Sequence, residues 1–346
     1  MPRLWQSSPE TVVLLTVQGF PPDTFKNHSG TAQELQTADK SGLGQYYLDT
    51  GRTILFLFAS VSSMMLPMKN ETLFGEDDGL LIPDVGPWTE DKFSLIRNYC
   101  QIFSSAMKNK WPTRIYIDLY AGSGLCRIKG RAQVLLGSPL IALSVDAPFN
   151  RYIFCEDAPE RFSALKARVK RNYADRELLL IPGKFKEHID EICSAIPSNS
   201  LALCFVDPFG CDFDIENLKT ISKCARGVDF LCLLALQMDA KRNIQHYMKP
   251  GSKIDRMIGN TTWRARWNNR SDHHEDFAKF LASEFAQSMS EVGYLETPLH
   301  MMEEVKTHDK SVPLYYLAIF AKHSLAFDLW KKARISSSPQ REFTFE

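Results

Sequence analysis

Four polar segments each follow a run of apolar residues, and their residue types suit the binding of a polar ligand. The first contains Asp118 with the glycines Gly122 and Gly124, and the second contains Glu156. A carboxylate accepts at least two hydrogen bonds, so either acid could hold a vicinal diol or an ammonium group. A glycine lets the backbone approach a ligand where a side chain would clash. The candidate ligand-binding residues are Asp118, Ala121, Gly122, Ser123, Gly124, Glu156, Asp157, Gly183 and Lys184.

The fourth polar segment, Asp207-Pro208-Phe209-Gly210, could orient a second reactant. Proline fixes φ and has no N–H group, so the chain around Pro208 can present oxygen acceptors to an amine. The ring of Phe209 could stack on a planar group. We therefore take Asp207, Pro208 and Phe209 as candidate catalytic residues.

Each segment also has a purely structural interpretation. A Gly-x-Gly sequence after a strand can be a tight turn, Glu156 could lie at the solvated start of a helix, and Asp207-Pro208 could form a turn. Lys92 and His323 are interpreted as structural residues. However, the acidic and glycine segments occur in order at the ends of successive predicted strands, and this order favours a shared binding site.

Residues 241–270 are a second candidate surface because they concentrate positive charge. They hold eight Lys and Arg residues and one acid, Asp255, which gives a net charge of +7. Tyr247, Trp263 and Trp267 are interleaved with the cations, and this combination suits phosphate contacts and base stacking. The alternative is a solvated helix with two core tryptophans. The candidate nucleic-acid contacts are Trp263, Arg264, Arg266 and Arg270.

The elements that must position these residues follow from the apolar pattern. Five near-continuous apolar strands alternate with helices, which indicates a parallel sheet covered on both faces. The carboxyl ends of such strands meet at one edge, where ligands bind. The predicted strands are residues 113–120, 151–157, 177–183, 201–210 and 228–237. The predicted helices begin near Thr89 and then cover residues 138–146, 158–173, 184–195, 214–225 and 272–291.

The flanking regions complete the predicted organisation. Two apolar segments on either side of residues 306–311 predict a C-terminal antiparallel hairpin. Residues 1–83 show no persistent helical or strand period, so we expect an N-terminal extension of uncertain structure. The domain should then cover residues 84–335, with a basic insertion near residues 238–271.

A further insertion separates the first glycine segment from the next helix. That helix should begin at Ser138, with proline at its first positions, rather than directly after Gly124. We expect the intervening residues to form a loop near the site. The loop is basic through Arg127, Lys129 and Arg131 and could contact substrate.

Composition gives weaker constraints on function. The chain has 346 residues, of which 41 are Lys or Arg and 41 are Asp or Glu, so any basic surface must be local. The longest apolar stretch, residues 54–68, is shorter than the ~20 residues that a membrane span needs. We therefore expect a cytoplasmic protein with no membrane association.

The cysteines indicate neither a metal site nor a redox site, because none forms a Cys-x-x-Cys pair. Most lie inside apolar runs. Buried thiols in a reducing compartment are the expected state. The eight cysteines are Cys100, Cys126, Cys155, Cys193, Cys204, Cys211, Cys224 and Cys232.

The polar segments together resemble those of class I S-adenosylmethionine-dependent methyltransferases. In that family an acid and a glycine loop after the first strand hold the methionine part of the cofactor, and an acid after the second strand holds the ribose hydroxyls. A (Asp/Asn)-Pro-Pro-aromatic tetrapeptide after the fourth strand holds a target amine. The resemblance implies an α/β fold, a mostly parallel seven-stranded Rossmann-like methyltransferase sheet with a C-terminal antiparallel hairpin, and S-adenosylmethionine as cofactor. Here Phe209 replaces the second proline and Gly210 replaces the aromatic residue.

A more specific resemblance, over about residues 84–334, is to the three-Cys-motif partner protein family. That family is methyltransferase-like and is named for its association with a three-cysteine, radical-SAM-like protein, which the resemblance implies as a partner. This chain has no three-Cys motif of its own, consistent with the partner role. The segments that carry the resemblance are GPWTEDK, YIDLYAGSG, GSPLIAL, YIFCED, CFVDPFG and YYLAIFAKHSLAFDLW.

These features favour an S-adenosylmethionine-binding protein that transfers a methyl group to an amine on DNA or RNA. Asp207 and the Pro208 carbonyl would accept hydrogen bonds from the target nitrogen, and Phe209 could stack on a base. Such a reaction depends mainly on alignment of the reactants. The rival hypothesis is a non-catalytic partner that uses the same fold to bind protein or nucleic acid. Calorimetry with S-adenosylmethionine, followed by a methyl-transfer screen, would separate the two.

Overall fold

The chain divides into two units, residues 1–69 and residues 70–346, which are described separately. In the first unit, β1 (Leu43–Leu48) and β2 (Arg52–Leu57) pair antiparallel. Most of the predicted N-terminal extension lies outside the described residues. The computed structural model describes residues 43–48, 52–57, 73–271, 274 and 276–337.

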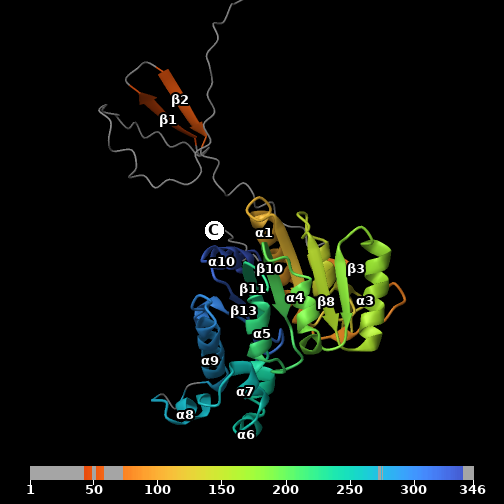
Figure 1. The fold of residues 1–346 in the computed structure, drawn as a ribbon, viewed down its shortest axis with the longest axis vertical. Helices are drawn as coiled ribbons and strands as arrows, with labels where there is room; N and C mark the ends of the chain where they lie inside the picture. The colour runs from red at the N-terminus through yellow and green to blue at the C-terminus, as the bar shows by residue number, and fades with distance from the viewer. Residues whose placement is uncertain (1–42, 49–51, 58–72, 272–273, 275, 338–346) are drawn as a thin grey trace, which may run out of the picture. The chain divides into compact units, whose positions relative to one another are not determined.

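The second unit is built on a seven-stranded sheet, as predicted (Figure 1). The strand order is β12-β13-β11-β10-β5-β8-β9, and the five strands from β11 to β9 are parallel. β13 is antiparallel to both β11 and β12, which confirms the C-terminal hairpin. The strands are β5 (Thr113–Asp118), β8 (Arg151–Glu156), β9 (Leu178–Pro182), β10 (Ser200–Val206), β11 (Gly227–Leu234), β12 (Glu303–Lys306) and β13 (Pro313–Phe320).

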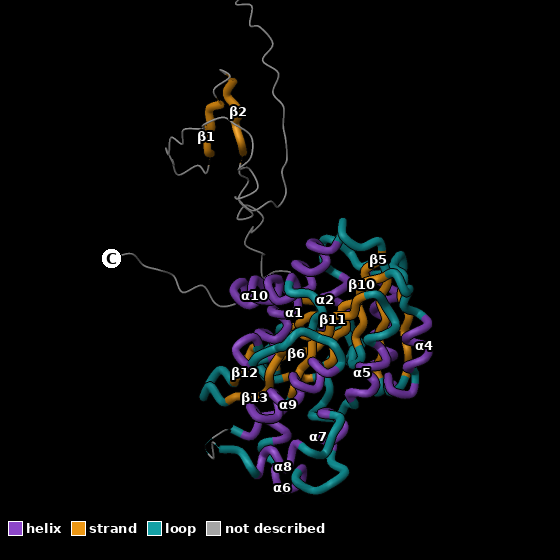
Figure 2. The backbone as a smooth tube through the Cα atoms, turned by 60° about the vertical axis from the view of Figure 1, so that its left-hand side comes forward, coloured by secondary structure: helices purple, strands orange, loops and turns teal. Residues whose placement is uncertain are grey.

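Helices cover both faces of this sheet (Figure 2). Successive side chains of a strand point to opposite faces, so each buried strand contributes to two cores. Ile115 and Ile117 pack in the core that includes α4, α5 and α9, whereas Tyr116 packs in the core that includes α1, α2, α3 and α10. The helices are α1 (Thr89–Met107), α2 (Ser138–Leu143), α3 (Pro159–Asn172), α4 (Ile189–Ser194), α5 (Ile215–Ile221), α9 (Phe277–Glu291) and α10 (Leu325–Ser337), with short 3-10 turns η4 (Phe185–Glu187) and η6 (Leu299–Met301).

A second, four-stranded sheet replaces the predicted loop between Gly124 and Ser138. Its order is β3-β7-β6-β4, and β6 and β7 form an antiparallel hairpin within the predicted insertion. The short strands β3 and β4 add to the edges of that hairpin. These two-residue strands show no sequence period, so only their pairing reveals them. The strands are β3 (Phe74–Gly75), β4 (Asp84–Val85), β6 (Leu125–Ile128) and β7 (Val134–Leu136).

The packed domain begins before residue 84, so the predicted boundary needs correction. Leu73 is buried, and Phe74 pairs with Leu135 of β7. Asp78 forms an ion pair with the buried Arg168 of α3, with Nη2 and Oδ1 2.7 Å apart. Residues 73–83 therefore belong to the domain through contacts with residues far along the sequence.

The predicted basic insertion forms a group of short helices after β11 (Figure 1). It starts with the π-helical turn η5 (Leu236–Ala240). Three short helices follow: α6 (Ile244–Tyr247), α7 (Lys253–Ile258) and α8 (Trp263–Asn268). α7 contacts α5 and α9, so the insertion extends one of the two cores beyond the sheet.

The expectation that every cysteine is a buried thiol is wrong for one pair. Cys193 of α4 and Cys224, which follows α5, form a disulfide with their Cα atoms 5.2 Å apart. The two residues are 31 positions apart, and only the packing of α4 beside α5 brings them together. The other six cysteines are buried and free. Among the described residues, no helix is long and apolar enough to cross a membrane.

Candidate functional site

The strand order reverses between β5 and β10, which makes their carboxyl ends the expected ligand site. The chain continues from β5 to β8 and β9 on one side, while β10 and β11 lie on the other. Ligands of open α/β sheets bind outside the strand carboxyl ends at such a point. Asp118 ends β5 and Asp207 follows β10, so both lie there. In Figure 1, β8 and β10 run toward the end of the unit that carries α6 and α7.

Asp118 is fully buried and has one oxygen without a partner. Its Oδ1 accepts a hydrogen bond from the Tyr120 N–H at 3.2 Å, whereas Oδ2 forms none among the described residues, and the Ser138 hydroxyl lies near the carboxylate. Burial raises the pKa of Asp118 to about 7, although the Ser138 hydroxyl and the Tyr120 N–H act in the opposite direction. The charges of Asp207 and Glu156 raise this pKa further. An unpaired buried carboxylate oxygen is unfavourable, so Oδ2 is available to a ligand cation or N–H group.

Glu156 ties the glycine loop after β5 to the end of β8. Its Oε2 accepts a hydrogen bond from the Gly122 N–H at 2.7 Å, and its Oε1 accepts one from the Ala158 N–H at 2.9 Å. Gly122 has φ +65°, and nothing lies within 4 Å of the position a Cβ would take. The backbone of Gly122 is therefore open to a ligand. Each Glu156 oxygen also keeps a further lone pair for a hydroxyl group.

The rest of the predicted glycine loop is held by buried backbone contacts. The Ala121 N–H donates to the Cys155 carbonyl at 2.8 Å, and the Ser123 hydroxyl donates to the Leu125 carbonyl at 2.6 Å. Gly124 has φ +86°, and its carbonyl accepts a hydrogen bond from a β7-flanking glycine, Gly137, at 2.7 Å. These residues fix the shape of the loop and place Gly122 at its open side.

The predicted residues after β8 and β9 differ in their surroundings. The Gly183 N–H donates to the Glu156 carbonyl at 2.9 Å, so Gly183 joins the site. Asp157 and Lys184 have exposed side chains that form no hydrogen bond or ion pair within the described part of the chain. The structure therefore brings Asp118, Gly122 and Glu156 together but leaves Asp157 and Lys184 at the surface.

Asp207 forms an ion pair with Lys92, a residue that we interpreted as structural and outside the site. Lys92 Nζ donates to Asp207 Oδ2 at 2.7 Å, and the two side chains are only 13% and 18% exposed. Lys92 lies in the first turn of α1, 115 positions earlier in the sequence. Its ammonium also lies 4.9 Å from the centre of the Phe93 ring. Lys92 thus belongs to the candidate catalytic group.

Asp239 of η5 forms a hydrogen bond with the loop that carries Phe209. Asp239 Oδ2 accepts a hydrogen bond from the Cys211 N–H at 2.9 Å, and Oδ1 accepts one from the Tyr247 hydroxyl at 2.8 Å. Gly210 has φ +90°, and a Cβ there would lie 2.6 Å from Asp239 Oδ2. Pro208 is buried, whereas Phe209 is 96% exposed. The Phe209 ring is therefore accessible to a partner.

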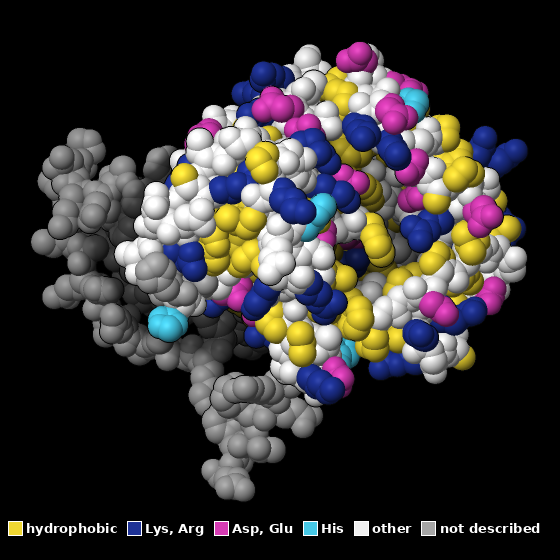
Figure 3. Space-filling view, turned by 90° about the horizontal axis from the view of Figure 1, so that it is seen from below, with side chains coloured by type: hydrophobic (Ala, Val, Ile, Leu, Met, Phe, Trp, Pro, Cys, Tyr) yellow, Lys and Arg dark blue, Asp and Glu magenta, His cyan; other side chains and the backbone are white. Residues whose placement is uncertain are grey.

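Figure 3 shows the end of the unit toward which β8 and β10 run. This face has a hollow near its centre, with hydrophobic side chains in its walls and both basic and acidic side chains around its rim (Figure 3).

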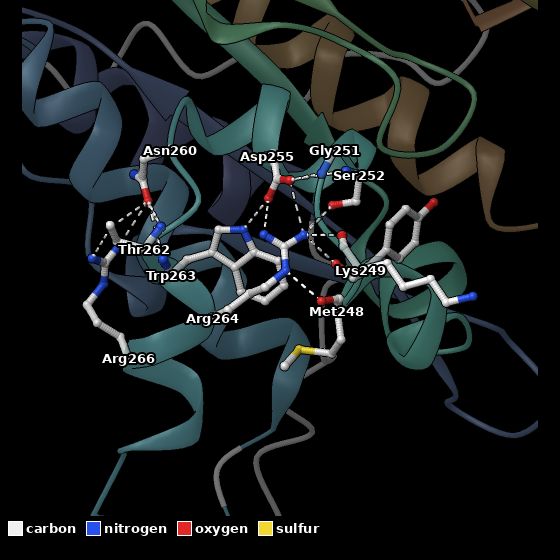
Figure 4. A network of polar contacts seen from close by, with 11 residues as sticks. Met248, Lys249, Gly251, Ser252, Asp255, Asn260, Thr262, Trp263, Arg264 and Arg266 are labelled. Atoms are coloured by element: carbon white, nitrogen blue, oxygen red, sulfur yellow. Dashed lines mark hydrogen bonds and ion pairs between the residues drawn. The ribbon is translucent and has the colours of Figure 1, made fainter.

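The two tryptophans of residues 241–270 lie in the core, as the alternative interpretation of this segment predicts. The prediction that Trp263 stacks on a base is therefore wrong. Trp263 is 0% exposed, and its Nε1 donates to Asp255 Oδ1 at 2.8 Å (Figure 4). Trp267 is 8% exposed and packs on Phe277. The charge-and-aromatic pattern was misleading here because both rings face the protein interior.

Arg264 is likewise a structural residue rather than a surface cation. Its guanidinium pairs with Asp255 and donates to the carbonyls of Met248 and Tyr247, each at 2.8 Å (Figure 4). Arg266 pairs with Glu284 of α9, and Arg270 stacks on a tryptophan ring and donates to its carbonyl. Satisfied cations of this kind have few donors left for phosphate. The exposed cations of the segment that pair with no acid in the described residues are Arg242 and Lys249.

Two residues that the sequence did not single out also shape the site. Arg168 is 1% exposed and donates to the Ser123 carbonyl at 2.6 Å and to the Leu81 carbonyl at 3.0 Å. Together with its ion pair to Asp78, it joins the glycine loop to the segment before β4. Asp239 is the second such residue. Neither could be found from periodicity, although a charged residue on the buried face of a predicted helix is a usable signal for Arg168.

The site fits the cofactor that the sequence implies. Asp118 Oδ2 is a buried acceptor without a partner, and the space beside Gly122 is open to the backbone. Asp118 and Glu156 supply the acceptors that an ammonium and a diol require. Within the described residues, no group of three or more His, Cys, Asp or Glu side chains is arranged to hold a metal ion.

No protein-family model matches the chain, and the comparison with curated proteins found no match. Among solved structures, Trm1 from Pyrococcus horikoshii with S-adenosyl-L-methionine is similar at 10% identity and a TM-score of 0.37, over 76% of this chain and 60% of that one. A complex of the Haloferax volcanii Trm112 methyltransferase activator with a methyltransferase is similar at 13% identity and a TM-score of 0.33, over 68% and 93% of the chains. Spermidine synthase with the transition-state analogue AdoDATO is similar at 10% identity and a TM-score of 0.39, over 91% of this chain and 78% of that one. The fold assignment rests on the strand order, and the functional argument rests on the residues described above.

Proposed function

We propose that this chain binds S-adenosylmethionine at the carboxyl ends of β5 and β8 and acts as a methyltransferase. One observation carries the proposal: a buried carboxylate oxygen without a partner, Asp118 Oδ2, lies at the sheet's switch point beside an open glycine loop. Glu156, which holds that loop, supplies acceptors for a diol.

The proposed roles follow from the donors and acceptors of each residue. Asp118 would accept hydrogen bonds from the amino group of the cofactor, and Glu156 from its ribose hydroxyls. Gly122 would let the backbone lie against the ligand. When bound, the cofactor supplies a methyl group on a positively charged sulfur, so the protein needs mainly to orient an acceptor.

For the acceptor, we propose an amine on a nucleic acid. Pro208 leaves its carbonyl free to accept a hydrogen bond, and Asp207 Oδ1 makes no contact with Lys92. Phe209 is exposed beside this pair and could stack on a base. Arg242 and Lys249 take over the phosphate-binding role that the sequence suggested for Arg264.

A three-Cys-motif protein is the proposed partner, on the basis of the sequence resemblance alone. The resemblance covers about residues 84–334, which is nearly all of the described second unit. Co-purification of the two proteins and a comparison of methyl transfer with and without the partner would test this part.

Titration calorimetry with S-adenosylmethionine and S-adenosylhomocysteine tests the cofactor. We expect binding by the wild type and a loss of about 1–3 kcal/mol in Glu156→Gln, because one charge-assisted acceptor is removed. Asp175→Asn is the matched control, because Asp175 is exposed at the opposite ends of the strands. Failure of the wild type to bind either compound would overturn the proposal.

Salt-dependent binding tests the nucleic-acid acceptor. In the double variant Arg242→Ala, Lys249→Ala, we expect weaker binding to single-stranded DNA or RNA and a log–log salt slope lower by up to about two. The double variant Lys108→Ala, Lys110→Ala, at the far end of α1, should leave both unchanged. If neither double variant changes the affinity for nucleic acid or its salt dependence, Arg242 and Lys249 do not contact the phosphates.

A non-catalytic binding protein remains the second candidate, because the Lys92 ammonium occupies one Asp207 oxygen. In that case cofactor binding would persist, and no methyl transfer to DNA, RNA or protein would be detected. Transfer to any of these acceptors would exclude it.

A further inference from the structure

We propose that Lys92 is itself a methyl acceptor, so that the chain methylates its own Lys92 Nζ. This inference rests on the proposed cofactor binding. Lys92 would then be a modification site. Its primary amine lies against Asp207, the residue that would hold an acceptor amine.

The contact between Lys92 and Asp207 has the geometry of a bound amine. Nζ lies 2.7 Å from Oδ2 of Asp207, the residue whose carboxylate would accept a hydrogen bond from an external amine. The Lys92 side chain is 13% exposed, so its end is largely withdrawn from solvent. The same helix places Phe93 and Ile96 in the core, with exposures of 7% and 0%. Lys92 is therefore held by a rigid element rather than by a mobile loop.

The charge of Lys92 also acts on the segment that follows the proposed cofactor loop. Cys126 comes two residues after Gly124, and burial raises the pKa of its thiol to about 11 while the Lys92 charge lowers it. On the other side, the Asp207 charge acts on Asp118. The charges of Lys92 and Asp207 thus act on residues of the segments that carry the proposed cofactor site.

The proposed step balances with the cofactor as the only co-reactant. Nζ first gives up a proton, to the Asp207 carboxylate or to water. Its lone pair then forms the new N–C bond as the S–CH₃ bond breaks, and that electron pair stays on sulfur. The products are N-methyl-lysine, which regains a positive charge, and S-adenosylhomocysteine.

Intact-mass and peptide mass spectrometry test the proposal directly. After incubation of the full chain with excess S-adenosylmethionine in alkaline buffer, we expect gains of about 14 Da per methyl group, mapped to the peptide that carries Lys92. Methylation of Lys92 in the protein as purified would support the proposal equally. Lys92→Arg should lose the modification, and Lys108→Arg, at the other end of the same helix, should keep it.

Calorimetry gives a second readout that requires no turnover. S-adenosylmethionine carries a sulfonium charge and S-adenosylhomocysteine does not, so a nearby ammonium should weaken only the former. Lys92→Met should therefore favour S-adenosylmethionine over S-adenosylhomocysteine by about fivefold relative to wild type, whereas Lys108→Met should not change the ratio.

The outcomes separate this inference from the proposed function. A protein that binds the cofactor but remains unmodified at Lys92, or is modified at another lysine, overturns the inference and leaves cofactor binding intact. A protein that binds neither compound overturns both. Asp207→Asn, if it unfolds at the wild-type temperature and binds the cofactor, should show reduced Lys92 methylation, and unchanged methylation would count against the orienting role of Asp207.

Discussion

At the residue scale, Asp118 should make ligand binding depend on pH. Its pKa is raised to about 7 because the side chain is buried. A cationic ligand binds the ionised form, so affinity for S-adenosylmethionine should rise from about pH 6 to about pH 8 and then level off. Near the lower pH, binding should release a proton, which calorimetry in two buffers of different ionisation enthalpy measures.

The substitution Asp118→Asn separates this effect from other titrations. It should remove most of the pH dependence and weaken binding at pH 8 by about 1–3 kcal/mol. Asp175→Asn should retain the wild-type profile, because Asp175 is exposed and remote from the site. A wild-type affinity that is flat between these pH values would show that Asp118 does not meet the ligand.

Asp229 of β11 makes a prediction about stability instead. Burial raises its pKa to about 7, and the positive charge of Lys322 opposes the shift. Because the folded pKa lies above the unfolded value, the protein loses stability as pH rises from about 4 toward 7. Asp229→Asn should therefore be more stable than wild type at pH 8, by about 1–4 kcal/mol, and nearly equal to it near pH 4.

Urea denaturation of Asp229→Asn and wild type at the two pH values measures the difference. The same comparison with Asp175→Asn controls for the loss of a charge, since Asp175 is 75% exposed and should be neutral at both. If Asp229→Asn destabilises at pH 8, the buried carboxylate has a stabilising contact that outweighs its desolvation.

At the element scale, the loop after β10 depends on its contact with η5. Gly210 adopts φ +90°, and an added Cβ would meet Asp239 Oδ2 at 2.6 Å. Gly210→Ala should therefore be less stable than Gly251→Ala by about 1–3 kcal/mol. Gly251 is the matched control, because it has φ +77° and nothing within 4 Å of its Cβ position. Equal losses in thermal melts would mean that backbone strain alone matters and that Asp239 moves freely.

The insertion after β11 shows why element-scale context changes the meaning of a motif. Residues 241–270 carry a net charge of +7, yet Arg264 is satisfied by Asp255 and by backbone carbonyls. Trp263 completes the core that α7 and α9 share. The same residue types on an exposed face would have formed the nucleic-acid surface that the composition suggested.

At the scale of the whole molecule, the boundary between the two units should be testable by truncation. Removal of residues 1–69 should leave the melting temperature within about 2 °C and cofactor affinity unchanged, because the second unit starts after residue 69. Removal of residues 1–80 should lower both, because it deletes Leu73 and breaks the Asp78–Arg168 ion pair.

The removal of residues 1–80 also tests whether the segment before β4 supports the glycine loop. Arg168 binds both Asp78 and the Ser123 carbonyl, so the loss of Asp78 should loosen the loop that holds the cofactor. Calorimetry of the two truncated proteins beside the substitution Asp78→Asn tests this link. Equal affinity in all three would show that the segment before β4 serves stability alone.

The strands of the main sheet and the positions of its acids could be predicted from the sequence alone. Strands such as β5 and β10 are buried on both faces, so they appear as continuous apolar runs that end where a polar residue begins. Asp118, Glu156 and Asp207 could therefore be assigned to strand ends from local pattern alone. The C-terminal hairpin followed from the same reasoning.

Which of those residues contact one another depends on tertiary packing. The contact of Lys92 with Asp207 joins residues 115 positions apart, and that of Arg168 with Asp78 joins residues 90 positions apart. Such contacts depend on how helices pack on the sheet, and no local period records them. The same holds for the burial of Trp263, because a helix of six residues is too short for its pattern to show which side faces the core.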